Sequence, residues 1–182
     1  MPTTDRKLTM EELDRPSPTA HRAASKLPIR IILDDVRSRH NVGSIFRTAD
    51  AFGAEGIILC GFTPQPPHRE IEKTALGATT SVPWTAMPSA LDALKQLKAQ
   101  GYRVLAVEQT VNAVPLDRVP VGQTGPVAVI FGNELHGVSE EVVAACDECV
   151  VIPQHGSKHS LNVSVCAGVV LFRLSNFSPN DH

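Results

Sequence analysis

Five predominantly apolar runs, separated by polar segments and helical patterns, constrain the fold of this 182-residue chain most strongly. The runs are residues 29–36, 56–61, 102–108, 127–131 and 149–152, with a shorter candidate at 81–84. Strands that are apolar along their whole length are typical of a parallel sheet whose two faces are both buried. Helical spacing lies between them, at 41–53, 89–101 and 139–146. We therefore expect an α/β protein with a mostly parallel sheet and helices on both faces.

The expected helices carry recognisable start and stop signals. Asn41 is placed to cap the first helix and Gly53 to end it, and Ser89 and Gly101 have the same places around the second. Ser160 is placed to cap a last helix near the end of the chain, although the alternation in this region also fits a strand.

Length and composition limit the organisation of the chain. We expect one domain at 29–176, after a polar tail or short helix and linker at 1–28 and before a short tail at 177–182. The net charge of −2 provides no general basic field, so a nucleic acid would have to meet a local basic patch. No stretch is apolar enough to predict a membrane span or a secretion signal, and four cysteines are read as reduced thiols. These features favour a cytoplasmic protein.

Several common sites are excluded by missing residues. The chain lacks a G-x-G-x-x-G dinucleotide fingerprint, and residues 56–63 have the glycine spacing of a phosphate loop but carry Phe62 where the lysine belongs. Cys146 and Cys149 form a C-x-x-C pair without two further ligands at zinc spacing, so we read them as half-buried thiols at a helix–strand junction. We expect no metal.

The first polar segment that suggests a site surrounds the helix expected at 41–53. Arg37, Arg39 and His40 precede it and make a local basic patch in a chain without general basicity. Arg47 falls about 200° from the apolar position Ile45, so it points away from the apolar stripe. An exposed surface arginine is the simple alternative, but the patch favours recognition of phosphate or carboxylate.

Two further polar segments follow apolar runs. Gly132 and Gly137 bracket Asn133 and Glu134 directly after one run, where glycines let a ligand approach the backbone closely. Lys158 and Asn162 lie in the polar stretch that opens the last apolar segment. Ligands of parallel sheets bind beyond the carboxyl ends of the strands, which is where all these segments fall.

The three segments, in this order, resemble the three signature motifs of the SpoU/TrmH branch of the SPOUT RNA methyltransferases. The matching stretches are 41–53 (NVGSIFRTADAFG), 131–139 (FGNELHGVS) and 152–168 (IPQHGSKHSLNVSVCAG). The resemblance implies an α/β domain with a deep C-terminal trefoil knot, an obligate homodimer and S-adenosylmethionine as methyl donor. It also implies methylation of a ribose 2′-hydroxyl in tRNA or rRNA.

The resemblance also implies roles for individual residues. The catalytic positions would be Asn41, Arg47, Glu134, Ser160 and Asn162. The cofactor would contact Val107, Glu108, Gly132, Ile152 and Leu161. RNA would be met by Arg37, Arg39, His40 and Lys158. We expect Arg47 to grip a phosphate and to stabilise the developing alkoxide, since a free guanidinium stays protonated and is a poor base.

Three other functions remain open at this point. A related SPOUT enzyme could methylate a base instead of a ribose, and a catalytically silent RNA-binding or assembly factor could keep the same fold. The topology alone would also fit a nucleotide-binding regulator, which would however need a phosphate loop. The sequence does not identify the substrate RNA or the general base.

Overall fold

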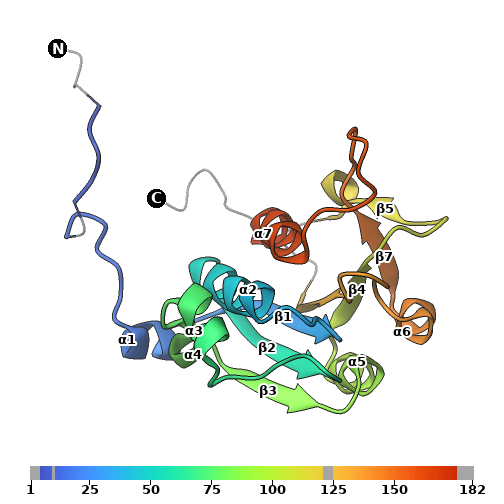
Figure 1. Ribbon diagram of the computed structural model, residues 1–182, viewed down its shortest axis with the longest axis horizontal. Coiled ribbons are helices and arrows are strands. Elements are labelled where there is room, and N and C mark those ends of the chain that lie inside the picture. The colour runs from blue at the N-terminus through green and yellow to red at the C-terminus, as the bar shows by residue number, and fades with distance from the viewer. Residues whose placement is uncertain (1–4, 10, 121–124, 176–182) are drawn as a thin grey trace.

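The computed structural model describes residues 5–9, 11–120 and 125–175, and its centre is a seven-stranded sheet in which all neighbouring strands are parallel (Figure 1). The strand order is β3-β2-β1-β6-β4-β7-β5. The strands are β1 (Leu27–Asp34), β2 (Ala54–Cys60), β3 (Trp84–Met87), β4 (Arg103–Val107), β5 (Val114–Pro115), β6 (Val127–Phe131) and β7 (Glu148–Val151). The predicted α/β class with a parallel sheet is confirmed.

Helices cover both faces of this sheet (Figure 1). The helices are α1 (Pro18–Ala23), α2 (Arg39–Ala51), α3 (Arg69–Ala75), α4 (Ala78–Ser81), α5 (Ala90–Ala99), α6 (Glu140–Ala145) and α7 (Val163–Leu174), with a 3₁₀ turn at Leu116–Arg118. Helices α2 and α7 pack side by side on one face, and α5 and α6 contribute to the core on the other. None of the helices in the described ranges is long and apolar enough to cross a membrane.

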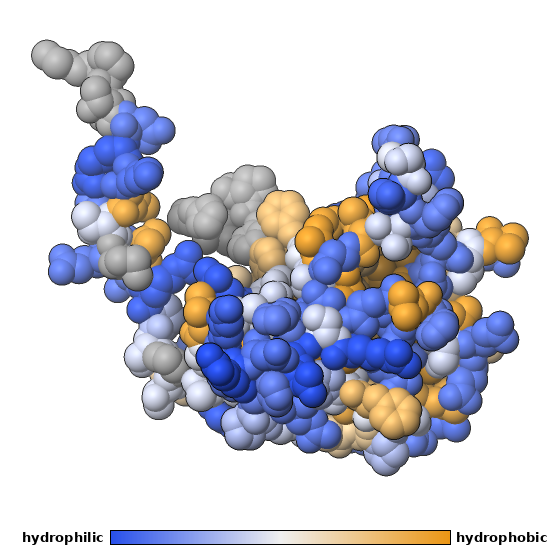
Figure 2. Space-filling view, in the orientation of Figure 1, coloured by the Kyte–Doolittle hydropathy of each residue, from blue (hydrophilic) through white to orange (hydrophobic). Residues whose placement is uncertain are grey.

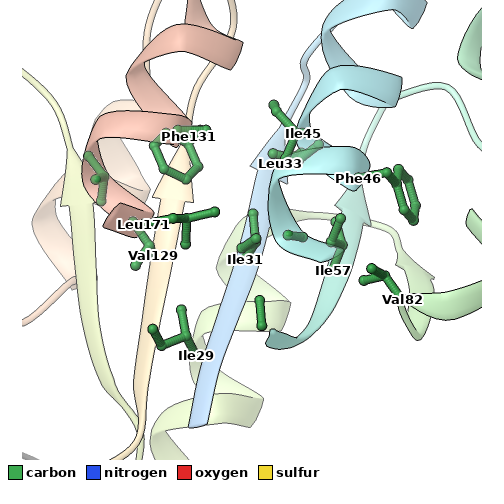
Figure 3. Packing of buried hydrophobic residues seen from close by; sticks show 14 of the residues in the cluster. Ile29, Ile31, Leu33, Ile45, Phe46, Ile57, Val82, Val129, Phe131 and Leu171 are labelled. Atoms are coloured by element: carbon green, nitrogen blue, oxygen red, sulfur yellow. The ribbon is translucent and has the colours of Figure 1, made fainter. Parts of the chain in front are cut away.

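Alternate residues of the central strands face two separate cores. On β1, Ile31 and Leu33 belong to the core under α2 and α7, whereas Ile32 belongs to the core under α5 and α6. Figure 3 shows the first core, where Phe46 of α2 and Leu171 of α7 lie over the sheet. Burial of such a side chain contributes about 1.5–3 kcal/mol, which explains why consecutive residues of the central strands, such as Ile31, Ile32 and Leu33, are apolar.

The helix ends confirm some predicted caps and correct others. Gly53 and Gly101 follow the last residues of α2 and α5 at φ of 62° and 86°, and the hydroxyl of Ser89 caps α5 as predicted. Asn41 does not cap α2, because the helix begins earlier and the Ser38 hydroxyl accepts the capping hydrogen bond. Ser160 does not cap α7 either, since Asn162 takes that position.

Three regions differ from the expected elements. The described residues 11–14 form a turn, whereas the sequence allows a short helix there. Helix α1 lies within the expected linker, where Ser17 caps it and proline fits its first turn. Helix α4 covers Ala78–Ser81, so the predicted strand at 81–84 begins only at Trp84. The tail expected at 177–182 lies outside the described residues.

Candidate active site

A cavity of about 500 Å³ lies at the carboxyl ends of β4, β6 and β7. It is bounded by the segments that follow these three strands and by the chain that leads into α7. The lining includes all five residues expected at the cofactor: Val107, Glu108, Gly132, Ile152 and Leu161. It also includes Glu134, Ser160 and Asn162 of the expected catalytic set. The structure therefore brings the second and third segments together, as the sheet topology predicts.

The loop after β6 is a tight turn that depends on glycine. Asn133 and Gly137 exchange two backbone hydrogen bonds of 2.9 Å, which fold the loop back on itself. A Cβ atom at Gly132 would lie 2.1 Å from the backbone carbon of Gly137, so a side chain there would force the turn apart. The close approach also leaves the backbone on one wall of the cavity accessible to a ligand.

Two side chains outside the expected site residues, Asn133 and Asp34, hold this loop in place. Asn133 is 8% exposed, donates a 2.8 Å hydrogen bond to the carbonyl of Asp35, and accepts from two amides of its own turn. Asp34 accepts hydrogen bonds from both the amide and the hydroxyl of Ser139. Asp34 is the last residue of the buried strand β1, and this place at the carboxyl end of a strand is the signal that could have identified it.

Glu108 ties β4 to the same loop. One carboxylate oxygen accepts a 2.9 Å hydrogen bond from the amide of Val138, and the other accepts from the amide of Gln109 at 2.8 Å. The carboxylate lies against Gly137, where an added Cβ would be 2.1 Å from it. Glu108 therefore places a negative charge at the cavity wall through fixed backbone contacts.

Glu134 connects the second segment to the start of α2. Its carboxylate accepts hydrogen bonds from the backbone amides of Arg37 and Ser38 at 2.9 and 3.0 Å, and from the side chain of Asn41 at 3.0 Å. Burial alone would raise the pKa of Glu134, but these donors outweigh it and hold the pKa below its usual value. A carboxylate at the N-terminus of α2 is also favoured by the helix dipole.

Asn162 connects the third segment to the first. Its side-chain oxygen accepts from the amides of Ser164 and Val165, the capping bonds of α7. Its side-chain nitrogen donates 3.1 Å to the oxygen of Asn41, whose own nitrogen donates to Glu134. One residue from each segment thus forms a continuous chain of hydrogen bonds beside the cavity.

The segment before α7 forms the remaining wall of the cavity. Gln109 donates a 2.5 Å hydrogen bond from its side chain to the carbonyl of His159, which fastens the segment to the end of β4. Ser160 and Leu161 line the cavity, whereas the exposed Lys158 does not.

Arg47 is not brought into this cavity within one chain. It follows Asn41 by six positions on α2, which places it about 240° around the helix and about 9 Å along it. The exposed Arg47 lines a different cavity of about 570 Å³, together with Arg15, His21 and Asp50. The expected catalytic set is therefore divided between two places on the chain.

The expected basic patch lies exposed at the start of α2. Arg37, Arg39 and His40 are all exposed there, and Arg39 makes a 3.5 Å ion pair with Glu70. Arg37 and Arg39 line a further hollow with Phe62 and Pro64.

The cysteine pair lies away from this edge of the sheet. The sulfur atoms of Cys146 and Cys149 are 3.7 Å apart, and burial raises the pKa of Cys146 to about 11. Within the described ranges, no group of three or more histidine, cysteine or acidic side chains is placed to hold a metal.

A family model described as the SpoU rRNA Methylase family matches residues 28–172. The chain is 33% identical, over 82% of its length, to the 23S rRNA (guanosine-2′-O-)-methyltransferase RlmB of Vibrio parahaemolyticus, of which it covers 60%. It is 32% identical, over 79% of its length, to the tRNA (guanosine(18)-2′-O)-methyltransferase of Escherichia coli, of which it covers 61%. The chain thus spans about three fifths of the length of these curated relatives.

Solved structures with the same fold include an AdoMet-bound rRNA methyltransferase from Sinorhizobium meliloti, with a TM-score of 0.76 and 32% identity. The match covers 87% of this chain and 60% of that one. The A. aeolicus TrmH/SpoU tRNA modifying enzyme also has a TM-score of 0.76, with 28% identity, and the match covers 85% and 78% of the two chains.

Proposed function

The chain belongs to the SpoU rRNA methylase family, and from this we propose that it transfers a methyl group from S-adenosylmethionine to a ribose 2′-hydroxyl of rRNA or tRNA. The observation that carries the proposal is the hydrogen-bonded chain Asn162–Asn41–Glu134, two of whose members line the cavity. Relatives named as ribose methyltransferases of both RNA classes support the reaction and leave the class of RNA open. We expect the protein to act in the cytoplasm, with these RNAs.

The cavity suits a ligand of the size of S-adenosylmethionine. Its volume of about 500 Å³ is within the usual range for small-molecule sites. Backbone groups of Val107, Gly132, Ile152 and Leu161 would hold the methyl donor, and the close turn at Gly132 keeps side chains out of the space. Glu108 provides a carboxylate that can accept hydrogen bonds from hydroxyl or amino groups. The donor would supply an activated methyl group.

The polar chain beside the cavity would position the ribose. Asn41 and Asn162 fix each other's amide orientation, and Ser160 adds a hydroxyl on the same wall. Holding a hydroxyl oxygen in line with a methyl carbon at roughly 3–3.5 Å can lower a barrier by about 7–11 kcal/mol. We assign Glu134 to holding the start of α2 and Asn41 in place, rather than to proton transfer, because its carboxylate accepts hydrogen bonds from those groups.

We propose that two copies of the chain form a homodimer through α7. Exposed apolar side chains gather over this helix (Figure 2), and they follow helical spacing from the cavity wall outwards. They are Val165, Val169 and Phe172 on α7, and Leu161, which lies two positions before the helix. Such a stripe on a soluble protein is typical of an association surface, and a symmetric dimer would use the same stripe twice.

In the proposed dimer, Arg47 can contribute to catalysis. Arg47 does not line the cavity of its own chain, but α2 packs beside α7 and would lie at the same interface. We propose that Arg47 of each copy serves the cavity of the other, where its guanidinium would bind a phosphate and stabilise the developing alkoxide.

We also propose that the chain is knotted, as the resemblance implies. The proposal is supported by the placement of β4 between β6 and β7 and by the return of α7 onto α2.

Transfer of labelled methyl groups from S-adenosylmethionine to bulk tRNA and to bulk rRNA, followed by digestion to nucleosides, tests the proposed reaction. Label on 2′-O-methyl nucleosides from one pool would establish the reaction and choose the class of RNA. Label on a base would identify a base-methylating enzyme instead. Donor binding without transfer to either pool would favour the silent RNA-binding protein.

A further inference from the structure

Phe62 presents an aromatic ring to solvent beside the proposed active site. Its side chain is 85% exposed, and the residue comes directly after Gly61 at the carboxyl end of β2. An isolated exposed hydrophobic side chain needs no explanation, but the surroundings of this one are unusual in two respects. The loop around it is rigidly held, and guanidinium groups stand next to it.

The loop that carries Phe62 is fixed on both sides of the ring. The backbone amide of Phe62 donates a 2.7 Å hydrogen bond to the carboxylate of Asp35, and Gly61 has a φ of 59° with no room for a Cβ beside that carboxylate. Thr63 is 3% exposed, and its hydroxyl accepts from the amide of Val36 and donates to the carbonyl of Leu33, both at 3.1 Å. The ring is therefore exposed although its backbone is anchored to β1.

The same anchor continues into the active-site loops. Asp35 has a φ of 55°, a left-handed conformation that non-glycine residues rarely adopt, and its carbonyl accepts from the side chain of Asn133. Asn133 precedes Glu134, which in turn holds the amide of Arg37. Phe62 is thus connected through a few hydrogen bonds to the residues that shape the cavity.

Two arginines line the same hollow as the Phe62 ring. Arg37, Arg39, Phe62 and Pro64 line a space of about 410 Å³. Among the residues that the structure describes, the ion pair of Arg39 is the exposed 3.5 Å contact with Glu70, which stabilises little and can be exchanged for a phosphate. In the described ranges the guanidinium of Arg37 has no ion-pair partner. Cationic side chains beside an exposed aromatic ring match the chemistry of single-stranded nucleic acid, which offers phosphates and stacking bases together.

We propose that Phe62 is a stacking platform for an unpaired base of the substrate RNA, adjacent to the methylated nucleotide, while Arg37 and Arg39 bind the flanking phosphates. The inference rests on the proposed function and adds to it, since it identifies a single-stranded or splayed-out target rather than an intact duplex. A duplex would keep its bases stacked on each other and out of reach of the ring.

Binding of a fluorescein-labelled, 12-nucleotide single-stranded RNA of mixed sequence tests the platform independently of catalysis. Phe62→Ala should weaken binding of this probe by about tenfold, because one base–aromatic contact is lost, and Phe62→Trp should retain the affinity. Val111→Ala is the matched control, since Val111 is 101% exposed and lines none of these sites. Arg37→Ala should also weaken binding and reduce its dependence on salt, whereas Phe62→Ala should leave the salt dependence unchanged.

Fluorescence of the Phe62→Trp variant separates stacking from phosphate binding. The chain has one tryptophan, Trp84, so wild type provides the background signal. We expect quenching of the new indole by the RNA but much less quenching by an abasic probe of the same length. Equal quenching by both probes, or unchanged affinity in Phe62→Ala, would overturn the inference.

The outcome is distinguishable from failure of the proposed reaction. If the wild-type protein methylates RNA, the Phe62→Ala variant should have a KM for the RNA about tenfold higher than wild type. Its kcat and its binding of S-adenosylmethionine should be nearly unchanged. Wild type that methylates no RNA would refute the proposed function, while quenching by the oligonucleotide would still establish the platform.

Discussion

The side-chain amide of Asn162 donates a 3.1 Å hydrogen bond to the side-chain oxygen of Asn41 across 121 positions of sequence. The oxygen of the same Asn162 amide caps α7 by accepting from the amides of Ser164 and Val165. The Asn162 side chain therefore stabilises α7 through its oxygen and holds the candidate site residue Asn41 through its nitrogen. Substitution can remove the two contacts separately.

Asn162→Asp should separate stability from activity. Aspartate keeps the capping oxygen but cannot donate to Asn41, so we expect nearly unchanged stability and methyl transfer reduced at least about tenfold. Asn162→Ala removes both contacts, and its free energy of unfolding should also fall by about 1 kcal/mol. Denaturant unfolding and transfer assays at one fixed protein concentration measure both effects. Equal activity of wild type and Asn162→Asp would show that the contact with Asn41 is dispensable.

Gly132→Ala should damage the cavity through its backbone. The added Cβ would lie 2.1–2.3 Å from backbone atoms of Gly137 and Val138, which belong to the tight turn. Overpacking of this kind costs about 1–3 kcal/mol, and we expect weaker S-adenosylmethionine binding in calorimetry because the wall must move. The matched control is Gly156→Ala, where an added Cβ meets no atom within 4 Å. Similar donor affinity in both variants would contradict a tight wall at Gly132.

Glu134 should make stability depend on pH in the acid range. Because hydrogen bonds hold the pKa of Glu134 in the folded state below its unfolded value, its contribution is complete above the unfolded pKa and is lost as the pH falls through the folded pKa. Glu134→Gln should lower the free energy of unfolding at pH 7 by less than about 1 kcal/mol, since the residue is only partly shielded from solvent. The difference between variant and wild type should shrink below about pH 4. A difference that grows on acidification would have the wrong sign.

The sequence predicts the central strands and most helix ends because these depend on local patterns. Ile31, Ile32 and Leu33 read as one apolar run since both faces of β1 are buried, and Gly53 and Gly101 are required by left-handed backbone. The sequence does not show that α2 begins before Asn41, because two hydroxyl or amide residues within four positions can each cap a helix.

Only part of the candidate site can be predicted from residues that are close in sequence. The glycines around Glu134 indicate a loop near a ligand, but its carboxylate contacts the start of α2, more than 90 positions away. The division of Arg47 from the cavity depends on the angle around α2 and on the position of α7. Neither the angle around α2 nor the position of α7 can be read from spacing along the chain. The order of the motifs therefore places Arg47 in one site with residues that lie elsewhere in the same chain.

Val165→Glu should dissociate the proposed dimer. Val165 is 53% exposed in one chain and sits in the middle of the apolar stripe on α7, where two copies would place like charges against each other. Sedimentation analysis should show wild type as a dimer and the variant as a monomer. Val111→Glu introduces the same charge at a fully exposed position away from α7 and should remain a dimer. A monomeric wild type would refute the proposed assembly.

Mixing two inactive variants should restore activity if Arg47 serves the cavity of the second copy. Arg47→Ala removes the arginine, and Asn162→Ala damages the cavity, so each homodimer should be inactive. In a mixed dimer, the intact cavity of the Arg47→Ala copy receives Arg47 from the Asn162→Ala copy, and one of two sites is complete. After exchange of subunits at equal concentration, about a quarter of wild-type activity should return, because about half of the dimers are mixed. If Arg47 acts within its own chain, every site in the mixture lacks one residue and no activity returns.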